Sequence, residues 1–376
     1  MDFALLYEIA VRNSANEIDM PWEEIVARPY SRKASQEVFK GLVDQVKIAD
    51  EVGFHSVWHV EHHFLHGISE SSNSDALLGA YAAATKNIRL GYGVKLLPFA
   101  YSHPVKAAAA VGVLDQLSGG RVEFGAGRSY TMEEMQGFQI PPGQTRPQLE
   151  ESLRLIMTAW ENDKFSWDSP NFKIPERTLV PKPLQEPHPP LWYAASSSES
   201  HEYAGENGMG LLSFALFVQL EEISRRLGVY RDALKRASPI GKFVNNRAAC
   251  FTVVHCAETD EQAQQEAAAR TTDYIKLALT LSWKTAKWIE ETKDSESYNY
   301  IRKTTNVDLS EVTFENLSDQ AMVIVGSPDT CIRQLKRYEE LGIDLFMGVF
   351  QHAGMPMEQV SKSIELFGRE VIPAFK

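Results

Sequence analysis

The sequence predicts a (β/α)8 barrel, a closed parallel sheet surrounded by helices. Strand-like and helical segments alternate along the whole chain, as they do in folds built from βα units. Eight strand-like segments can be counted, one at each of Phe3, Val57, Ile88, Val122, Leu191, Gly210, Cys250 and Leu345. A doubly wound open sheet alternates in the same way, but its dinucleotide-binding form carries a glycine fingerprint after the first strand. No such fingerprint follows Phe3, so the barrel is favoured.

The first half of the chain contains clear start and stop signals for helices. Apolar residues at helical spacing lead to Gly53, where a helix is expected to end. Pro104 suits the first turn of a later helix, which Gly119 and Gly120 close. The elements expected here are a polar loop at 12–35, helices at 39–49, 75–85 and 104–117, and strands at 57–60, 88–94 and 122–127.

The second half continues the alternation after a helix whose apolar face includes Leu149, Leu153 and Trp160. A proline-rich segment at 166–190 is expected to be an irregular connection. The remaining expected elements are strands at 191–195, 210–214, 250–254 and 345–349, and helices at 200–207, 219–237 and 332–341.

One segment is longer than the barrel pattern requires. Between the seventh and eighth strands, residues 271–319 exceed what a single barrel helix needs, so we expect an insertion within one domain spanning 1–376. Its first half has an apolar face and its second half is strongly charged. Because it leaves the barrel at the carboxyl ends of the strands, it is expected to fold over the mouth as a lid. The alternative is a surface or subunit-contact excursion.

Composition indicates a globular protein without a nucleic-acid or membrane role. Of 376 residues, 44% are apolar and 23% are charged, which suits a chain with a large core. The net charge is −12 and there is no lysine- or arginine-rich tract to follow a phosphate backbone. The N-terminus lacks the features of a signal peptide, and no apolar run is long enough to cross a membrane. The three cysteines lack metal-binding or CxxC spacing, so a cytoplasmic location is expected.

Glu61, His62 and His63 directly follow the second predicted strand and are the strongest candidates for chemistry. The pKa of histidine lies near neutrality, so such a group beside a carboxylate can exchange protons. Neighbouring residues of an extended segment point in opposite directions, so only one of the two histidines is expected to face a common pocket. The same geometry argues against a shared metal ion, and no metal site is expected. The alternative for either histidine is a packed, hydrogen-bonded role.

Two further segments suggest an anion site. Ala194 to Ser200 lies where the fifth strand becomes a helix, and backbone N–H groups at a helix start attract anions. Arg128 follows Gly125-Ala126-Gly127 at the end of the fourth strand and supplies a planar donor group. Together they predict a phosphate clamp on neighbouring strand ends. A salt bridge at the barrel rim together with an ordinary helix cap is the alternative.

Several motifs, in order, resemble those of the bacterial luciferase-like flavin monooxygenases, and the match spans almost the whole chain. The motifs are Trp58-His59-Val60-Glu61-His62-His63-Phe64, Leu96-Leu97-Pro98, His103-Pro104-Val105, 114–125, Val325-Gly326-Ser327-Pro328 and Glu370-Val371-Ile372-Pro373. The resemblance implies a luciferase-like TIM barrel that accepts reduced FMN from a separate flavin reductase. With O2, the flavin would oxidise a small or medium apolar organic substrate.

The resemblance also implies roles for individual residues. His62 would be the catalytic acid/base, with Glu61 and His63 in support. The flavin phosphate would be held by Arg128, after the fourth strand, and by Ser197 and Ser200, after the fifth. Ala195 and Ser196, in the same loop as these serines, would also contact the cofactor. A cis peptide bond between Gly93 and Val94 would lie beneath the flavin ring. We expect the pocket to be shaped by aromatic residues, namely Phe64, Tyr130 and Phe350.

The chain departs from the family pattern at several positions. Ser196 stands where a glutamate is common, and Lys95 lies beside the expected cis bond, where apolar residues are common. We expect Lys95 to form an ion pair at the barrel rim rather than contact the flavin. Phe99 and Tyr101 lie in what reads as a two-residue addition that would reshape the pocket wall. Light emission coupled to aldehyde oxidation is therefore not the expected reaction.

Two other functions remain open at this point. The same superfamily includes deazaflavin-dependent oxidoreductases, which transfer hydride without oxygen, and a flavin-binding protein without turnover is also compatible with the fold. A homodimer formed through the helices at 75–85 and 104–117 is expected from the resemblance, whereas packing of these helices on the barrel alone is the alternative.

Overall fold

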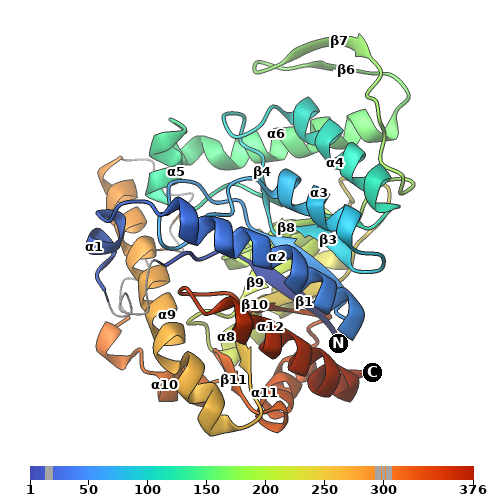
Figure 1. Ribbon diagram of the computed structural model, residues 1–376. Coiled ribbons are helices and arrows are strands. Elements are labelled where there is room, and N and C mark those ends of the chain that lie inside the picture. The colour runs from blue at the N-terminus through green and yellow to red at the C-terminus, as the bar shows by residue number, and fades with distance from the viewer. Residues whose placement is uncertain (13–19, 293–297, 299–300, 302–306) are drawn as a thin grey trace.

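The structure is a computed structural model that describes residues 1–12, 20–292, 298, 301 and 307–376 (Figure 1). Part of the polar loop expected at 12–35 and part of the segment expected as an insertion, 271–319, lie outside the described residues.

Eight parallel strands close into a barrel, which confirms the predicted fold. Each strand pairs with the next along the chain, and the last pairs with the first, Phe346 opposite Phe3. The strands are β1 (Asp2–Tyr7), β2 (Ser56–His59), β3 (Arg89–Tyr92), β5 (Val122–Gly127), β8 (Leu191–Ala194), β9 (Gly210–Phe214), β10 (Ala248–Cys256) and β12 (Leu345–Val349). All eight predicted strands are therefore present.

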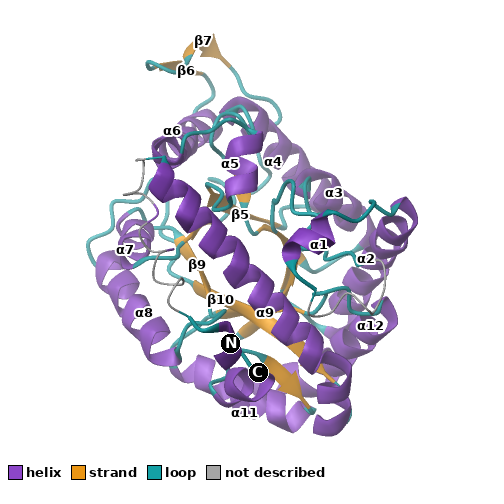
Figure 2. Ribbon diagram, turned by 90° about the vertical axis from the view of Figure 1, so that its left-hand side faces the viewer, coloured by secondary structure: helices purple, strands orange, loops and turns teal. Residues whose placement is uncertain are grey.

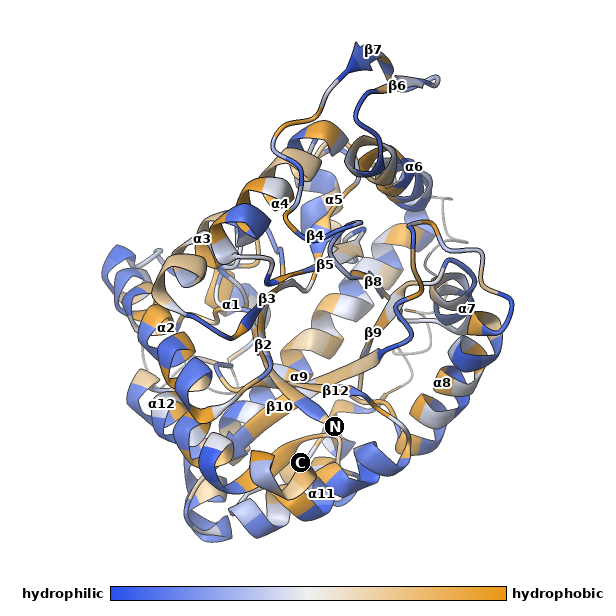
Figure 3. Ribbon diagram, turned by 90° about the vertical axis from the view of Figure 1, so that its right-hand side faces the viewer, coloured by the Kyte–Doolittle hydropathy of each residue, from blue (hydrophilic) through white to orange (hydrophobic). Residues whose placement is uncertain are grey.

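Helices surround the barrel and place their apolar sides against it (Figure 3). Gly53 and Gly119 end two of them with positive φ angles of 94° and 69°, as their positions in the sequence predict. The surrounding helices are α2 (Arg32–Val52), α3 (Ser74–Ala84), α4 (Pro104–Ser118), α6 (Pro142–Glu161), α7 (Ser198–Glu206), α8 (Leu220–Leu234), α11 (Pro328–Glu340) and α12 (Met357–Leu366). The chain ends in two short helical segments, Phe367–Val371 and Ile372–Phe375.

The structure differs from the sequence-based expectation in two strand regions. The segment expected to be irregular contains an antiparallel hairpin, β6 (Phe165–Asp168) and β7 (Lys173–Arg177), which projects from the body (Figure 1). Its prolines hid the strand pattern. A short strand, β11 (Ile324–Gly326), pairs with the end of β10 outside the barrel and was also missed. It is too short to carry a clear period of two.

The third barrel strand is divided in two. After β3, a short β4 (Lys95–Leu96) continues along β5. The peptide bond between Gly93 and Val94 lies between β3 and β4, and it is cis, as expected from the resemblance.

A long helix, α9 (Asp260–Glu291), lies across the barrel strands (Figure 2). Residue 271, where the insertion was expected to begin, is inside this helix, so helix α9 continues through the expected boundary without interruption. Further along are a short 3-10 helix, η4 (Leu309–Glu311), and α10 (Phe314–Asp319). Two small helices, α1 (Trp22–Val26) and α5 (Met132–Gly137), complete the described helices.

The barrel interior is packed around two tryptophan rings. Trp58 and Trp192 are buried and meet edge to face, with ring centroids 5.5 Å apart. Gly91 on β3 leaves the space that Trp58 occupies, since a Cβ atom there would lie 2.0 Å from the indole ring. Among the described residues, no helix is both long enough and apolar enough to cross a lipid bilayer.

Replacing Gly91 with alanine is expected to destabilise the protein, because the new methyl group would overlap Trp58 in a closely packed barrel. Overpacking of a core costs about 1–3 kcal/mol in the free energy of unfolding. Urea denaturation measures this change. Gly79→Ala on α3 is the control, because a Cβ atom there meets nothing within 4 Å and alanine favours a helix by about 0.5–1 kcal/mol. Equal stability of Gly91→Ala and wild type would contradict the packing described.

Candidate active site

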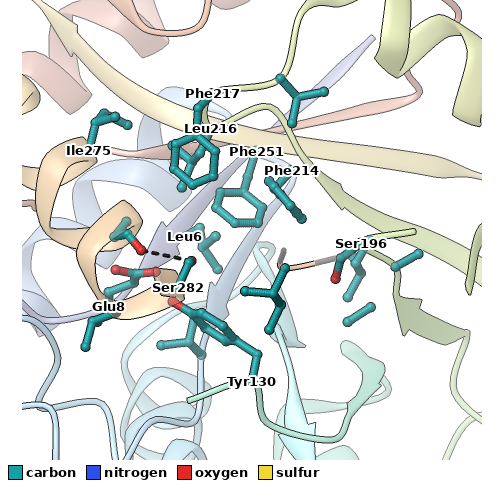
Figure 4. Close-up of a pocket in the computed structure, with 18 of the residues that line it drawn as sticks. Leu6, Glu8, Tyr130, Ser196, Phe214, Leu216, Phe217, Phe251, Ile275 and Ser282 are labelled. Carbon is teal, nitrogen blue, oxygen red and sulfur yellow. Dashed lines mark hydrogen bonds between the residues drawn. The ribbon is translucent and has the colours of Figure 1, made fainter. Parts of the chain in front are cut away.

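A cavity of about 640 Å³ opens at the carboxyl ends of the barrel strands. This volume is within the range of cofactor and ligand sites, and in TIM barrels this end carries the active site. Strand ends supply part of the wall, and the middle of α9 supplies another part through Ile275, Ala278 and Ser282 (Figure 4). Val307, Glu311 and Leu317, from the segment around η4 and α10, line it as well. Part of the segment expected as an insertion therefore borders the cavity.

His62 lines this cavity and is held by a carboxylate that sequence reasoning missed. Its Nδ1 atom lies 2.9 Å from Oε1 of Glu134, a fully buried residue on α5. Glu134 also accepts hydrogen bonds from the backbone N–H of His63 and from the hydroxyls of Ser129 and Thr131. With Nδ1 engaged, the other ring nitrogen, Nε2, is left without a protein partner in the described part of the chain.

The buried pair adjusts the pKa of both partners. Burial alone would lower the pKa of His62, but the charge and hydrogen bond of Glu134 outweigh it and the net shift is upward. Burial would raise the pKa of Glu134, yet the His62 charge and the hydrogen bonds from Ser129 and Thr131 lower it. The arrangement therefore favours the protonated form of the His62 imidazole.

The other two members of the motif lie differently. Glu61 lines the cavity, and its carboxylate accepts a hydrogen bond from the backbone N–H of Leu96 at 3.0 Å. His63 is 3.4 Å from Glu61, and its ring stacks on Tyr101 and meets Phe138 edge to face, outside the cavity wall. Only His62 of the two histidines lines the cavity, in agreement with the opposite directions expected for neighbours.

Arg128 and the loop after β8 lie at another part of the wall. The Arg128 guanidinium lies over the Tyr298 ring, 4.2 Å from its centroid, and both Arg128 and Ser196 line the cavity, as does Ala195. Ser197 and Ser200 do not line it. They form a capping box at the start of α7, in which each side chain accepts from the other residue's backbone N–H. Their hydroxyls hold the backbone of the loop that carries Ser196, because the Ser200 hydroxyl accepts from the backbone N–H groups of Ser196 and Ser197.

A second arginine near Ser196 was missed from the sequence. Arg226 on α8 lines the cavity, donates to the backbone carbonyl of Ser196 at 3.0 Å and pairs with Glu222 at 2.7 Å. It lies about one hundred residues along the chain from Arg128 and belongs to no motif, so only the fold could reveal it.

Gly93 and Val94 form a smooth part of the wall. A Cβ atom at Gly93 would approach Leu6 and Trp58 within 3.3 Å, so glycine at this position allows Leu6 and Trp58 to pack closely against the backbone. Lys95 is buried and makes hydrogen bonds of 2.8 and 2.7 Å to the two carboxylate oxygens of Asp75. The expectation that Lys95 forms an ion pair is confirmed, with Asp75 of α3 as its partner.

The aromatic wall differs from the expectation in two of three residues. Tyr130 lines the cavity and meets His62 edge to face. Phe64 is 61% exposed, and Phe350 packs in the core against Phe54 and Phe367, so neither lines the cavity. The rings that do line it beside Tyr130 are Tyr193, Phe214, Phe217, Phe251 and Tyr274. These rings belong to segments far apart in the sequence, and closure of the barrel brings them together around the cavity.

Within the described part of the chain, no group of three or more histidine, cysteine, aspartate or glutamate side chains could hold a metal ion.

Replacing Glu134 with glutamine is expected to lower the pKa of His62, because the charge that raises it is removed. Histidine titration followed by NMR measures this shift. The raised pKa of His62 stabilises the fold below roughly pH 6.5 and this contribution is lost as pH rises through the folded-state value. The lowered pKa of Glu134 stabilises it above roughly pH 4.5 and is lost at lower pH.

The loss of stability in Glu134→Gln is therefore expected to be largest between those two pH values, at about 3 kcal/mol, the lower end for breaking a buried pair. Glu133→Gln, a neighbour on α5, is the control and should leave the pKa of His62 close to the wild-type value. An unchanged pKa of His62 in Glu134→Gln would contradict the described pairing.

Comparison with known proteins supports one family. The model of the family described as luciferase-like monooxygenase matches residues 25–345. The oxygenase component of a flavin-dependent trigonelline monooxygenase from Acinetobacter baylyi is 26% identical over 93% of each chain. An F420-dependent glucose-6-phosphate dehydrogenase from Amycolatopsis mediterranei is 25% identical, covering 92% of this chain and 97% of its own length.

A solved structure adds support for the fold. The oxygenating constituent of 3,6-diketocamphane monooxygenase from Pseudomonas putida, in complex with FMN, superposes with a TM-score of 0.75 at 23% identity, covering 100% of this chain and 98% of its own. With the barrel, its cavity and a family match across most of the sequence, the chain belongs to the luciferase-like monooxygenase family.

Proposed function

We propose that this protein is the oxygenase component of a two-component flavin monooxygenase, using reduced FMN and O2 to oxidise a small or medium organic substrate. The observation that carries the proposal is the position of His62, which lines the same cavity as Gly93 and Val94 while its Nδ1 atom is paired with Glu134. The relative named as the oxygenase component of a flavin-dependent trigonelline monooxygenase supports the reaction class.

The cavity residues fit a flavin at both ends. Gly93, Val94 and Leu6 offer an apolar surface for the ring system. Arg128 and Arg226 bring positive charge to the region of Ser196, which suits the phosphate group. Ser197 and Ser200 would act on the phosphate indirectly, by fixing the loop that carries Ala195 and Ser196. The bound flavin would supply the oxygen-activating chemistry.

His62 would move a proton at Nε2. The Glu134 carboxylate fixes the ring orientation and stabilises its protonated form, so Nε2 can donate and recover a proton without reorienting. Glu61 would hold the neighbouring backbone at Leu96, and His63 would contribute its backbone N–H to Glu134. The aromatic wall would exclude water from the reacting groups.

The proposal also gives roles to the segment 271–319 and to two partner proteins. Because α9 and α10 line the cavity, this segment would act as the lid that closes over bound substrate. A flavin reductase would supply the reduced FMN, and a second copy of this chain would pack against α3 and α4.

An F420-type deazaflavin is the second candidate, supported by the F420-dependent relative at similar identity. Equilibrium titration with FMN and with F420 separates the two. Tighter binding of F420, with hydride transfer in the absence of oxygen, would replace the monooxygenase proposal.

Replacing His62 with glutamine is expected to lower oxygenation by about 10²- to 10⁴-fold, the usual contribution of a general acid/base, while FMN binding is kept. Product can be followed as ¹⁸O incorporated from ¹⁸O2, using a reductase to supply reduced FMN and a panel of cyclic ketones and N-heterocycles. His66→Gln in the same loop is the matched control, because its ring faces Tyr30. Equal product from His62→Gln and the control would remove His62 from the proposed role.

Replacing Arg128 with alanine is expected to weaken FMN binding by about 10- to 100-fold, since hydrogen bonds to charged groups contribute about 1.5–3 kcal/mol. Fluorescence quenching of FMN measures the dissociation constant. Riboflavin, which lacks the phosphate, should bind both proteins alike. Arg369→Ala, which removes a surface partner of Glu365, is the control for a general loss of charge. Unchanged FMN affinity in Arg128→Ala would place the phosphate elsewhere.

A further inference from the structure

A carboxyl group at the end of β1 is not used by the proposed chemistry. Glu8 directly follows Tyr7, the last residue of β1, and lines the cavity. Figure 4 shows its carboxyl group on the same side as Ser282, with Ser196 on the opposite side. A carboxyl group in an apolar cavity is costly to desolvate unless a partner compensates, so its presence calls for an explanation.

Among the described residues, the protein donates a hydrogen bond to only one of the two carboxyl oxygens of Glu8. Tyr274 on α9, itself 5% exposed, donates its hydroxyl to Oε2 of Glu8 at 2.8 Å. No residue in the described parts of the chain donates to Oε1. One carboxyl oxygen therefore remains for a ligand.

The nearby positive charges are committed elsewhere. Among the described residues that line the cavity, the arginines are Arg128 and Arg226, and Arg226 is bonded to Ser196 across the cavity from Glu8. His62 is the cation that acts on Glu8, but it is paired with Glu134. Burial raises the pKa of Glu8, more than the His62 charge and the Tyr274 hydrogen bond lower it. Among the residues that the structure describes, this group therefore lacks a full counter-charge.

Aromatic rings complete this side of the site. Tyr130, Tyr274, Phe217 and Phe251 line the cavity, and the last two lie above Glu8 in the close-up (Figure 4). Faces of aromatic rings attract organic cations, with a larger effect where water is excluded. A carboxylate combined with several rings is a suitable environment for a flat, positively charged molecule.

We propose that Glu8, held by Tyr274, determines substrate specificity by pairing with a positively charged nitrogen, so that the substrate is a small organic cation with an otherwise apolar, flat body. An N-alkylated heteroaromatic ring or a protonated arylamine has this chemistry. This inference rests on the proposed function and narrows its substrate class. Glu8 is a binding residue in this account and takes no part in proton transfer.

Two probes of nearly the same shape test the charge preference. 1-Methylpyridinium and toluene differ by one positive charge, and benzoate supplies the opposite charge. Ligand-observed NMR titrations with FMN-saturated protein give the dissociation constant of each. Wild type is expected to bind 1-methylpyridinium at least about tenfold more tightly than toluene, as one desolvated ion pair would give, and benzoate most weakly.

Three variants identify the responsible group. Glu8→Gln keeps the shape and can still donate a hydrogen bond, but it removes the charge, so the preference for the cation should disappear. Glu8→Asp keeps the charge and should retain part of the preference. Glu51→Gln, an exposed carboxylate on α2 that does not line the cavity, is the control and should bind like wild type, because exposed charges are screened by water.

The outcomes separate this inference from the proposed function. A wild-type protein that binds FMN but does not prefer 1-methylpyridinium to toluene would overturn the role of Glu8 alone, as would a preference that survives in Glu8→Gln. Tighter binding of benzoate would also overturn it. Failure of wild type to bind FMN at all would instead contradict the monooxygenase proposal.

Discussion

Closure of the parallel sheet, through pairing of β1 with both β12 and β2, is the constraint on which the site depends. Because all eight strands run in the same direction, their carboxyl ends meet at one mouth. Glu8, His62, Arg128 and Ser196 follow four of those strands, and closure brings them from positions far apart in the sequence to one cavity. The interior tryptophans, with glycine at position 91, fill the barrel and pack with Leu6, Leu212 and Met347, which line the cavity.

Within the mouth, buried carboxylates organise the polar groups. Glu134 accepts from the His62 ring, from the His63 backbone and from two hydroxyls, so one side chain fixes both the loop after β2 and the segment before α5. Such a network is stable only when each member has a partner. Glu8 differs, since Tyr274 donates to one of its oxygens and no described residue donates to the other, which we propose to be the contact for a ligand. The contrast distinguishes a positioning carboxylate from one suited to binding.

The fold could be predicted largely from local sequence, because strand and helix periods and the glycines that end helices are local features. The Glu61-His62-His63 motif and Arg128 could be found because each directly follows a strand. Glu134, Arg226, Tyr274 and Glu8 were missed as site residues because their importance arises from contacts between segments distant in the chain. Phe64 and Phe350 were wrongly expected in the wall, since an aromatic residue near a strand end can face outward or into the core. Proline similarly hid the β6–β7 hairpin.

In the proposed function, a flavin would lie in the cavity with its ring system against Gly93 and Val94, near His62, and with its phosphate near Arg128, Arg226 and Ser196. A crystal structure of the protein with FMN bound tests this claim most directly. We expect the ring system to contact Gly93 and Val94, with Nε2 of His62 close to its reactive edge and the phosphate within hydrogen-bond distance of Arg128. A ring bound away from His62, or a phosphate at the opposite side near Glu8, would contradict the account.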